Sequence, residues 1–372
     1  MASHQLDILI LASLTAVTCA LPGVFLILRK VALMSDAISH AILLGIVLAF
    51  FVTKNLSSPL LILGATLVGI ATVTLTELLI NTQKLKQDAA IGLVFPLLFS
   101  VGVILINKFA GDVHIDSDCV LFGEIAFTPF NRLVVNGMDL GPQATWVMLG
   151  VLVLNTTFIS LFYKELKVGT FDFGLAASLG FLPVVLNYAL MGIVSVTAVA
   201  AFESVGSILV VALMIVPPAA AYLLTDRLSV MIGISAGLGI ASALGGYWLA
   251  YVLDASISGC MAVFSGLIFM FVFIFAPERG LLTKMILKKW QKWDFASEML
   301  SVHLLQAEYA HAEETEQVVS HMNDHMLWNN NYTSEVITKS LQEGLIKKQG
   351  NKLSLTNLGR EKAKSSIVKK SG

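Results

Sequence analysis

Long apolar stretches, separated by short polar turns, occupy the first three quarters of the chain. A helix needs about 20 apolar residues to cross the hydrocarbon core of a bilayer. Proline inside a helix is expected to break or kink it, which concerns Pro183 and the pair Pro217-Pro218. The pattern predicts an all-α polytopic membrane protein with eight or nine transmembrane helices. The nine candidate spans are residues 7–28, 31–52, 59–80, 89–107, 145–163, 177–198, 202–224, 229–252 and 258–276.

The pattern changes after residue 279, where charged residues become frequent. A basic segment with two tryptophans comes first, and both residue types are typical of the membrane interface. The remaining residues mix short apolar and polar runs, as a small soluble domain does. We therefore expect a transmembrane domain over 1–279, an interfacial linker helix over 280–296 and a small cytoplasmic α+β domain over 297–372.

The composition excludes several classes of protein. Only 13% of the 372 residues are charged, whereas a soluble domain carries about 25%. The net charge of −1 argues against a nucleic-acid binder with a basic surface. The cysteines, Cys19, Cys119 and Cys260, are far apart and predict neither a disulfide framework nor a zinc ribbon. The sequence has no P-loop and no zinc-protease motif, so we do not expect an enzyme.

Basic residues in the short loops predict the orientation of the helices, because Lys and Arg are enriched on the cytoplasmic side. The loops of one side carry three such residues, Lys54, Lys108 and Arg132. We expect the other side, with eight, to face the cytoplasm together with the C-terminal domain. These eight residues are Arg29, Lys30, Lys84, Lys86, Lys164, Lys167, Arg227 and Arg279.

Two ionisable side chains stand out inside the second predicted span. Asp36 and His40 are four residues apart, so a helix places them one turn apart on the same face. Ionisable groups inside a membrane are costly and usually functional. A carboxylate and an imidazole at this spacing can bind one divalent cation, and a copy across a two-fold axis would supply two more ligands. The alternative is a hydrogen bond that stabilises a polar contact between helices.

Four further residues are weaker candidates for metal ligands. Glu77 lies near the cytoplasmic end of the third predicted span, where its carboxylate could instead reach the interface. Glu203 lies at the start of the seventh predicted span and could be interfacial. His114 and Asp116 lie in an acidic outer loop, which could collect cations or simply be solvated.

The run LRKVALMSDAISHA at residues 28–41 resembles a signature of the metal-uptake permeases of ATP-binding-cassette (ABC) transporters, with Lys30 where a second Arg is common. These permeases are the membrane subunits that import manganese, zinc or iron. Further motifs follow in the family's order, and the resemblance covers about residues 8–276. They are QDAAIG at 87–92 with Phe95 and Phe99 after it, LFGE at 121–124, Phe171-Asp172, and Pro217-Pro218-Ala219.

The resemblance implies a multi-pass permease in a bacterial cytoplasmic membrane that imports manganese, with zinc or iron as alternatives. It implies no permanently bound cofactor, only the transported metal. The implied partners are cytoplasmic ABC ATPase subunits, an extracytoplasmic metal-binding protein, a second permease in a homo- or heterodimer, and membrane lipid. In this family the Asp and His of the first motif line the translocation path, which corresponds to Asp36 and His40.

The resemblance also implies a site for coupling to the ATPases. A short cytoplasmic helix between the fifth and sixth spans would sit in a cleft of the ATPase and pass on the closure caused by ATP binding. Gly180 by itself would also fit the end of any helix. The matching residues are Phe171, Asp172, Ala177, Leu179, Gly180 and Phe181.

The C-terminal domain resembles the winged helix of metal-responsive repressors of the diphtheria-toxin-repressor type, through a pattern that runs from Leu341 to Ala363. Its expected recognition helix offers only Lys339 against nearby acidic residues, so nucleic-acid binding is not expected. His321 and His325 are four residues apart and could bind a metal or face solvent.

Two other functions are consistent with the same sequence. The chain could be a membrane-anchored, metal-responsive regulator that acts through its C-terminal domain. Deleting the tail would separate this function from a transporter, which should keep some uptake. An intramembrane metal hydrolase would need a further ligand and an acid–base residue beside Asp36 and His40, and the motifs offer neither.

Overall fold

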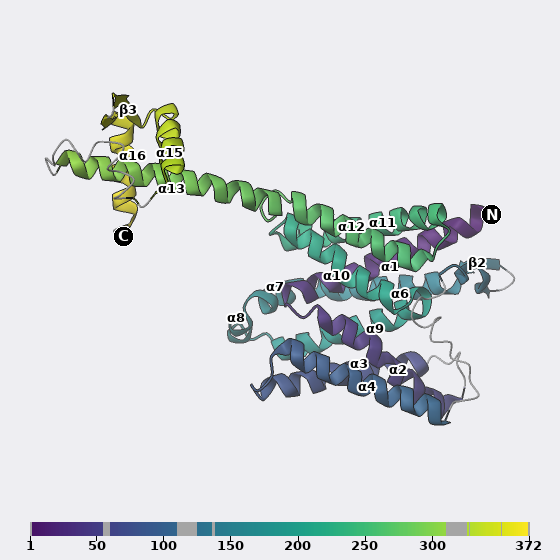
Figure 1. The fold of residues 1–372 in the computed structure, drawn as a ribbon. Coiled ribbons are helices and arrows are strands. Elements are labelled where there is room, and N and C mark those ends of the chain that lie inside the picture. The colour runs from purple at the N-terminus through teal and green to yellow at the C-terminus, as the bar shows by residue number, and fades with distance from the viewer. Residues whose placement is uncertain are drawn as a thin grey trace. The chain divides into compact units, whose positions relative to one another are not determined.

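The computed structural model describes residues 2–54, 60–109, 125–135, 138–309, 326, 328–350 and 352–370. Two compact units make up the chain (Figure 1). Unit 1 is Met1–Gly280 and is mainly helical; unit 2 is Leu281–Gly372 and combines helices with a small sheet.

Nine of the described helices are long and apolar enough to span a bilayer, and all of them belong to unit 1. The prediction of an all-α polytopic membrane protein is thereby confirmed. The helices are α1 (Ala2–Leu28), α2 (Leu33–Thr53), α3 (Leu60–Asn81), α4 (Gln87–Phe109), α6 (Gln143–Leu161), α9 (Pro183–Val205), α10 (Ser207–Leu224), α11 (Leu228–Leu253) and α12 (Ile257–Phe275).

The prolines predicted to break or kink helices start one helix and leave another unbroken. Pro183 is the first residue of α9 and therefore starts the sixth span, which was predicted to begin at residue 177. Proline is favoured at this position because the first N–H groups of a helix have no partner within it. Pro217 and Pro218 lie inside α10, which continues through them from Ser207 to Leu224. Neighbouring helices must cover the carbonyl groups that these prolines leave without donors.

The core of unit 1 is formed mainly by α1, α2, α9 and α10. Leu11, Ile38, Val194 and Leu213 are among its fully buried side chains. Helices α4 and α12 expose many large apolar side chains, as helices that face lipid do. Helix α2 belongs to the buried core, so its position is set by close packing on several sides.

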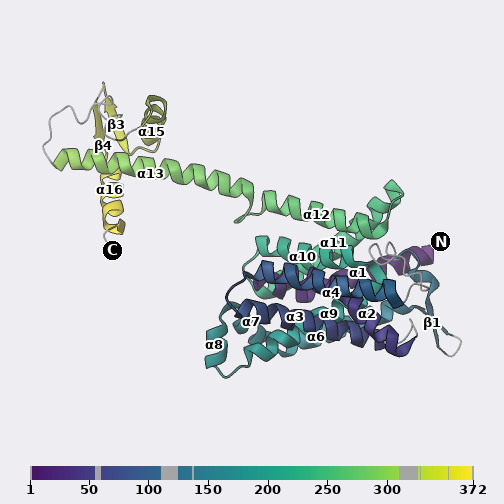
Figure 2. The same ribbon diagram turned by 60° about the horizontal axis from the view of Figure 1, so that its bottom comes forward.

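The two ends of the bundle carry different structures (Figures 1 and 2). Two short helices, α7 (Tyr163–Phe171) and α8 (Phe173–Ser178), lie at one end. At the opposite end lies an antiparallel hairpin of β1 (Arg132–Val135) and β2 (Met138–Pro142), preceded by the 3-10 turn η1 (Thr128–Phe130). The hairpin belongs to the loop that was predicted to lie outside the cytoplasm.

Unit 2 is built around one long helix and a two-stranded sheet. The strands pair antiparallel, with Ile346 opposite Leu355 and Lys348 opposite Leu353. The small core contains Leu300 and Val336 from the helices and Leu353 from the sheet. The elements are α13 (Leu281–Tyr309), α15 (Asn330–Gln342), β3 (Ile346–Gln349), β4 (Lys352–Leu355) and α16 (Asn357–Lys370).

Candidate functional site

Asp36 and His40 lie one turn apart near the beginning of α2. His40 Nε2 is 3.3 Å from Asp36 Oδ1. The side chains of His40 and Asp36 are 32% and 37% exposed, whereas the three residues between them are buried. The pair therefore occupies a partly open stripe on a helix that is packed on its other sides.

Two phenylalanines of α4 lie beside the imidazole. The ring of Phe95 stacks on His40 with a centroid distance of 5.7 Å, and the ring of Phe99 meets it edge-on at 5.9 Å. Neither ring offers a metal ligand. A cation that reaches the pair must therefore approach from the exposed side of the stripe.

The pair has no third ligand within the part of the chain that the structure describes. No group of three His, Cys, Asp or Glu side chains there could hold a metal ion. One carboxylate and one imidazole are fewer than the four ligands of a closed zinc site. A single chain therefore presents either half of a metal site or a place that a metal ion passes while it keeps some of its water ligands.

The weaker candidates do not join this pair. Glu203 is exposed in the last turn of α9, so its predicted position at the start of the next span is wrong. Glu77 lies one turn before the end of α3 and contacts Asn187 of α9 instead. His114 and Asp116 lie outside the described residues.

Glu77 is part of a hydrogen-bonded network that the sequence analysis did not find. Asn187 Nδ2 donates to Glu77 Oε1 at 2.5 Å, and Asn187 Oδ1 accepts from Arg29 Nη1 at 2.7 Å. Arg29 Nε also donates to Thr170 Oγ1 of α7 at 3.1 Å. Burial lowers the pKa of the Arg29 guanidinium, which nevertheless stays protonated at neutral pH. The available signal was Asn187 itself, an amide in an otherwise apolar run.

The predicted coupling segment, residues 171–181, contains the end of α7, all of α8 and the turn after it. Asp172 caps α8, because its Oδ1 accepts from the N–H of Leu175 at 2.9 Å. Gly180 has a φ of +83°, and the N–H groups of Gly180 and Phe181 donate to carbonyls of α8. This is the pattern of a Schellman motif, so Gly180 ends the helix.

The segment around α8 exposes a patch of apolar side chains at the end of unit 1, beyond the spans. Ala176 is buried beneath it and Ala177 is exposed. Exposed apolar patches of this kind occur where a protein contacts another protein or a membrane. Five side chains, each 49% to 67% exposed, form the patch: Phe171, Phe173, Leu175, Leu179 and Leu182.

Residues 4–276 match the family model described as the ABC 3 transport family. The chain belongs to this family. It is 42% identical over 354 residues to the zinc transport system membrane protein TroD of Treponema pallidum, with 95% of this chain and 96% of that protein covered. It is 48% identical over 271 residues to the manganese transport system membrane protein MntD of Bacillus subtilis, with 73% of this chain and 92% of that protein covered.

A solved structure supports the same assignment. PsaBC from Streptococcus pneumoniae in complex with Fab resembles this chain with a TM-score of 0.61 and 29% sequence identity. The similarity covers 73% of this chain and 92% of that one. The ABC 3 match ends at residue 276, whereas the TroD alignment also takes in most of unit 2.

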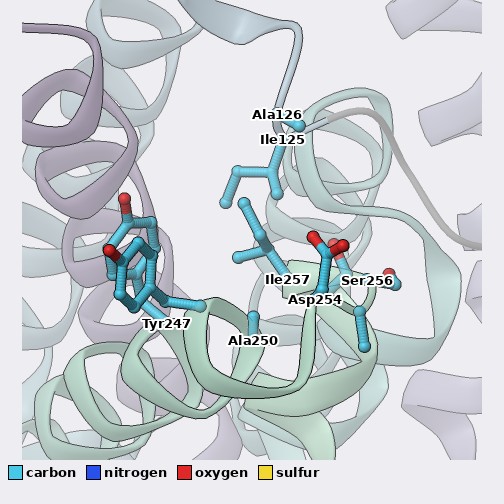
Figure 3. A pocket seen from close by; sticks show the side chains of 10 residues that line it. Ile125, Ala126, Tyr247, Ala250, Asp254, Ser256 and Ile257 are labelled. Carbon is cyan, nitrogen blue, oxygen red and sulfur yellow. The ribbon is translucent and has the colours of Figure 1, made fainter. Parts of the chain in front are cut away.

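A hollow of this ABC 3 bundle is lined by side chains of α11 and α12 and by Ile125 (Figure 3). It is a pocket of about 320 Å³ at the junction of α11 and α12. Asp254, Ser256, Tyr247 and Ile125 line it. Neither Asp36 nor His40 is among the described residues that line this pocket, so it is separate from the Asp36–His40 pair.

Unit 2 of this ABC 3 protein uses its lysines in internal packing. Lys339 Nζ, from the only basic residue of α15, lies 4.8 Å from the ring centre of Trp290 and 5.5 Å from that of Trp293. Lys292 Nζ lies 4.5 Å from the ring centre of Tyr332. These cation–π contacts join α15 to α13. They hold Lys339 against α13.

Proposed function

We propose that this chain is the membrane permease subunit of an ATP-driven importer of a divalent transition metal, with manganese as the first candidate and zinc and iron as alternatives. The observation that carries the proposal is the Asp36–His40 pair on the open stripe of an ABC 3 family bundle. TroD is named for zinc and MntD for manganese. Oxygen and nitrogen donors without a thiolate suit all three metals.

The cation is the substrate, and the pair would act on it in passing. Asp36 supplies a negative charge that offsets part of the cost of removing water from the ion. His40, in its neutral form, supplies a nitrogen ligand. A second permease that presents the same pair would raise the number of protein ligands to four. Phe95 and Phe99 would limit the directions from which the ion approaches.

In this proposal ATP hydrolysis takes place in separate cytoplasmic subunits, and α8 is the surface that contacts them. The exposed apolar side chains of Phe173 and Leu175 suit a cleft of another protein. Asp172 and Gly180 hold both ends of this short helix, so it can transmit a push instead of unwinding. A metal-binding protein on the outer side would deliver the ion.

We assign unit 2 a winged-helix-like fold, a cytoplasmic position and a role in assembly or regulation. The order of α13, α15, the β3–β4 hairpin and α16 supports the fold. The beginning of α13 would lie along the inner leaflet as the interfacial linker helix. The support for this is a set of exposed basic and apolar side chains, among them Lys284, Ile286, Lys288 and Trp290.

Uptake of radiolabelled Mn²⁺ and Zn²⁺, in cells that co-express the chain with its transporter partners, tests the proposal. Asp36→Asn removes the carboxylate charge and His40→Gln removes the imidazole nitrogen, each at a similar side-chain size, and each should lower uptake by about ten-fold or more. His4→Gln is the matched control: His4 also stacks on a phenylalanine, Phe130, but pairs with no carboxylate in the described residues. The better-transported ion identifies the metal.

Either of two results would reject the proposal. Normal uptake in both Asp36→Asn and His40→Gln, at matched membrane abundance, would reject the site. Absence of uptake by the intact chain, in a complex whose assembly has been verified, would reject transport itself.

A further inference from the structure

A continuous set of polar contacts links three spans of unit 1 to the segment that precedes α8. Arg29, just after α1, is its centre. One side of the guanidinium binds Thr170 in the last turn of α7, and the other binds Asn187 near the start of α9. Asn187 in turn binds Glu77 of α3.

The chemistry of this network depends on the amide of Asn187. Its oxygen can only accept and takes a hydrogen bond from Arg29, while its nitrogen can only donate and gives one to Glu77. The positive and negative groups are therefore joined through one neutral side chain. Replacing the amide by an apolar group would leave two half-buried charges without this partner, which is costly at the edge of a membrane.

At the end nearest α8, the network holds the residues that precede this helix. Thr170 is followed by Phe171, the last residue of α7, and by Asp172, the N-cap of α8. Only two residues thus separate the contact with Arg29 from the residue that starts the exposed helix. A displacement of α8 would act on Arg29 almost directly.

At its other end the network includes Glu77 of α3. Helix α3 packs in turn against α2, which carries Asp36 and His40. A Cβ added at Gly69 of α3 would lie 2.0 Å from Ser195 Oγ of α9 and 3.3 Å from Ile38 Cγ2 of α2. A Cβ added at Gly45 of α2 would lie 2.6 Å from the Cα of Ala65 in α3. These contacts leave no room for α3 to shift without moving its neighbours, because packed interiors transmit displacement.

We propose that Arg29, Asn187 and Glu77 are positioning residues that transmit the movement of α8 to α9 and α3, and through α3 to the Asp36–His40 pair. This inference rests on the proposed function, in which α8 contacts the ATPases. The three residues do not touch the ion. They determine whether ATP hydrolysis is converted into metal transport.

The test uses the complete transporter in proteoliposomes, with the external metal-binding protein loaded with Mn²⁺. Mn²⁺ taken up and ATP hydrolysed are measured in the same vesicles for Arg29→Gln, Asn187→Leu and Glu77→Gln, singly and in pairs. Arg29→Lys is included because it keeps the charge but offers a single ammonium to two acceptors. Arg279→Gln is the matched control: Arg279 binds Asp226 and the Tyr222 carbonyl in another loop predicted to be cytoplasmic.

We expect the ratio of Mn²⁺ transported to ATP hydrolysed to fall about ten-fold in each network variant, which is a typical size for coupling between sites. Hydrolysis should stay within about two-fold of the intact protein, and paired variants should be no worse than single ones, since each change breaks the same network. Arg29→Lys should lower the ratio less, and Arg279→Gln should leave it unchanged.

Three results would overturn proposals made here, and they can be told apart. An unchanged ratio in all three single variants would show that the network transmits nothing. A parallel loss of uptake and hydrolysis, including in Arg29→Lys, would show a purely structural role. If the intact transporter takes up neither Mn²⁺ nor, with the binding protein loaded with Zn²⁺ instead, Zn²⁺, the proposed function is overturned, and this inference with it.

Discussion

Gly23 of α1 lies against the carbonyl oxygen of Met214 in α10: a Cβ added at Gly23 would be only 2.0 Å from that oxygen. Met214 is four residues before Pro218, so its carbonyl is the one that Pro218 deprives of a helical donor. A freed carbonyl inside a membrane needs protein or water around it. The bare backbone of α1 at Gly23 provides that cover for the carbonyl that Pro218 leaves without a donor.

We predict that Gly23→Ala destabilises unit 1. The added methyl group meets backbone atoms, which cannot rotate away, and overpacking of this kind costs about 1–3 kcal/mol. Thermal unfolding in detergent, followed by size-exclusion chromatography, measures the effect. Gly233→Ala is the control, because an added Cβ there meets nothing within 4 Å and alanine favours a helix. Equal melting temperatures of the two variants would contradict this account.

The C-terminal end of α8 provides a second prediction. Gly180→Ala places a Cβ on a residue with φ of +83°, at a cost of about 1–2 kcal/mol. We expect α8 to lose its last turn and metal uptake to fall. Gly174→Ala, inside the same helix, would meet only Asp172 Oδ1 at 3.5 Å and should leave uptake intact. Equal uptake by both variants, measured in whole cells, would show that the closing turn is dispensable.

Substitutions in the apolar patch of α8 should weaken the binding of ATPase subunits. Phe173 is 55% exposed, and central aromatic residues of interfaces contribute about 2 kcal/mol or more. Phe173→Ser should therefore reduce the ATPase recovered with the purified permease. Phe130→Ser, at the opposite end of the bundle and 74% exposed, is the matched control. If both variants recover the same amount of ATPase, α8 is not the contact surface.

The lysines at the beginning of α13 should bind anionic lipid. Each Lys near an anionic surface contributes about 1 kcal/mol, so replacing Lys284, Lys288 and Lys289 by Gln should free this segment from the membrane. Hydrogen exchange of residues 281–293, in nanodiscs of anionic or neutral lipid, measures this. Exchange in the intact chain should be slower with anionic lipid, and the triple variant should lose that difference. Equally fast exchange of the intact chain in both lipids would exclude the contact.

The sequence narrowed the number of spans to eight or nine, and the structure has nine candidate spans among the described residues, but some span ends could not be predicted. Residues 177–182 are mostly apolar, so hydropathy joins them to the sixth span, although they form the end of α8 and the turn before Pro183. In the same way, the break between α9 and α10 falls at Gly206, which has a φ of +80°. The hydropathy of a segment does not show where the backbone leaves the helical conformation. Glu203 was therefore assigned to the wrong span.

Part of the candidate site could be predicted from the sequence, and part could not. Asp36 and His40 lie within one helical turn, so their spacing alone predicts their proximity. Arg29 and Asn187 are 158 residues apart, and Asn187 and Glu77 are 110 apart. Contacts at such separations depend on how the helices pack, which a single sequence does not reveal. The sequence analysis named Glu77 as a possible metal ligand, but nothing in it connected Glu77 with Arg29 or Asn187.

The open stripe of α2 has a consequence for how tightly an ion can be held. One chain offers two ligands, so the remaining positions around the ion belong to water or to another subunit. Conduction requires sites that bind strongly enough to admit an ion and weakly enough to let it leave. If two such stripes face each other, the residence time of the ion depends on the gap between the subunits. Opening that gap would release the ion without any change inside α2.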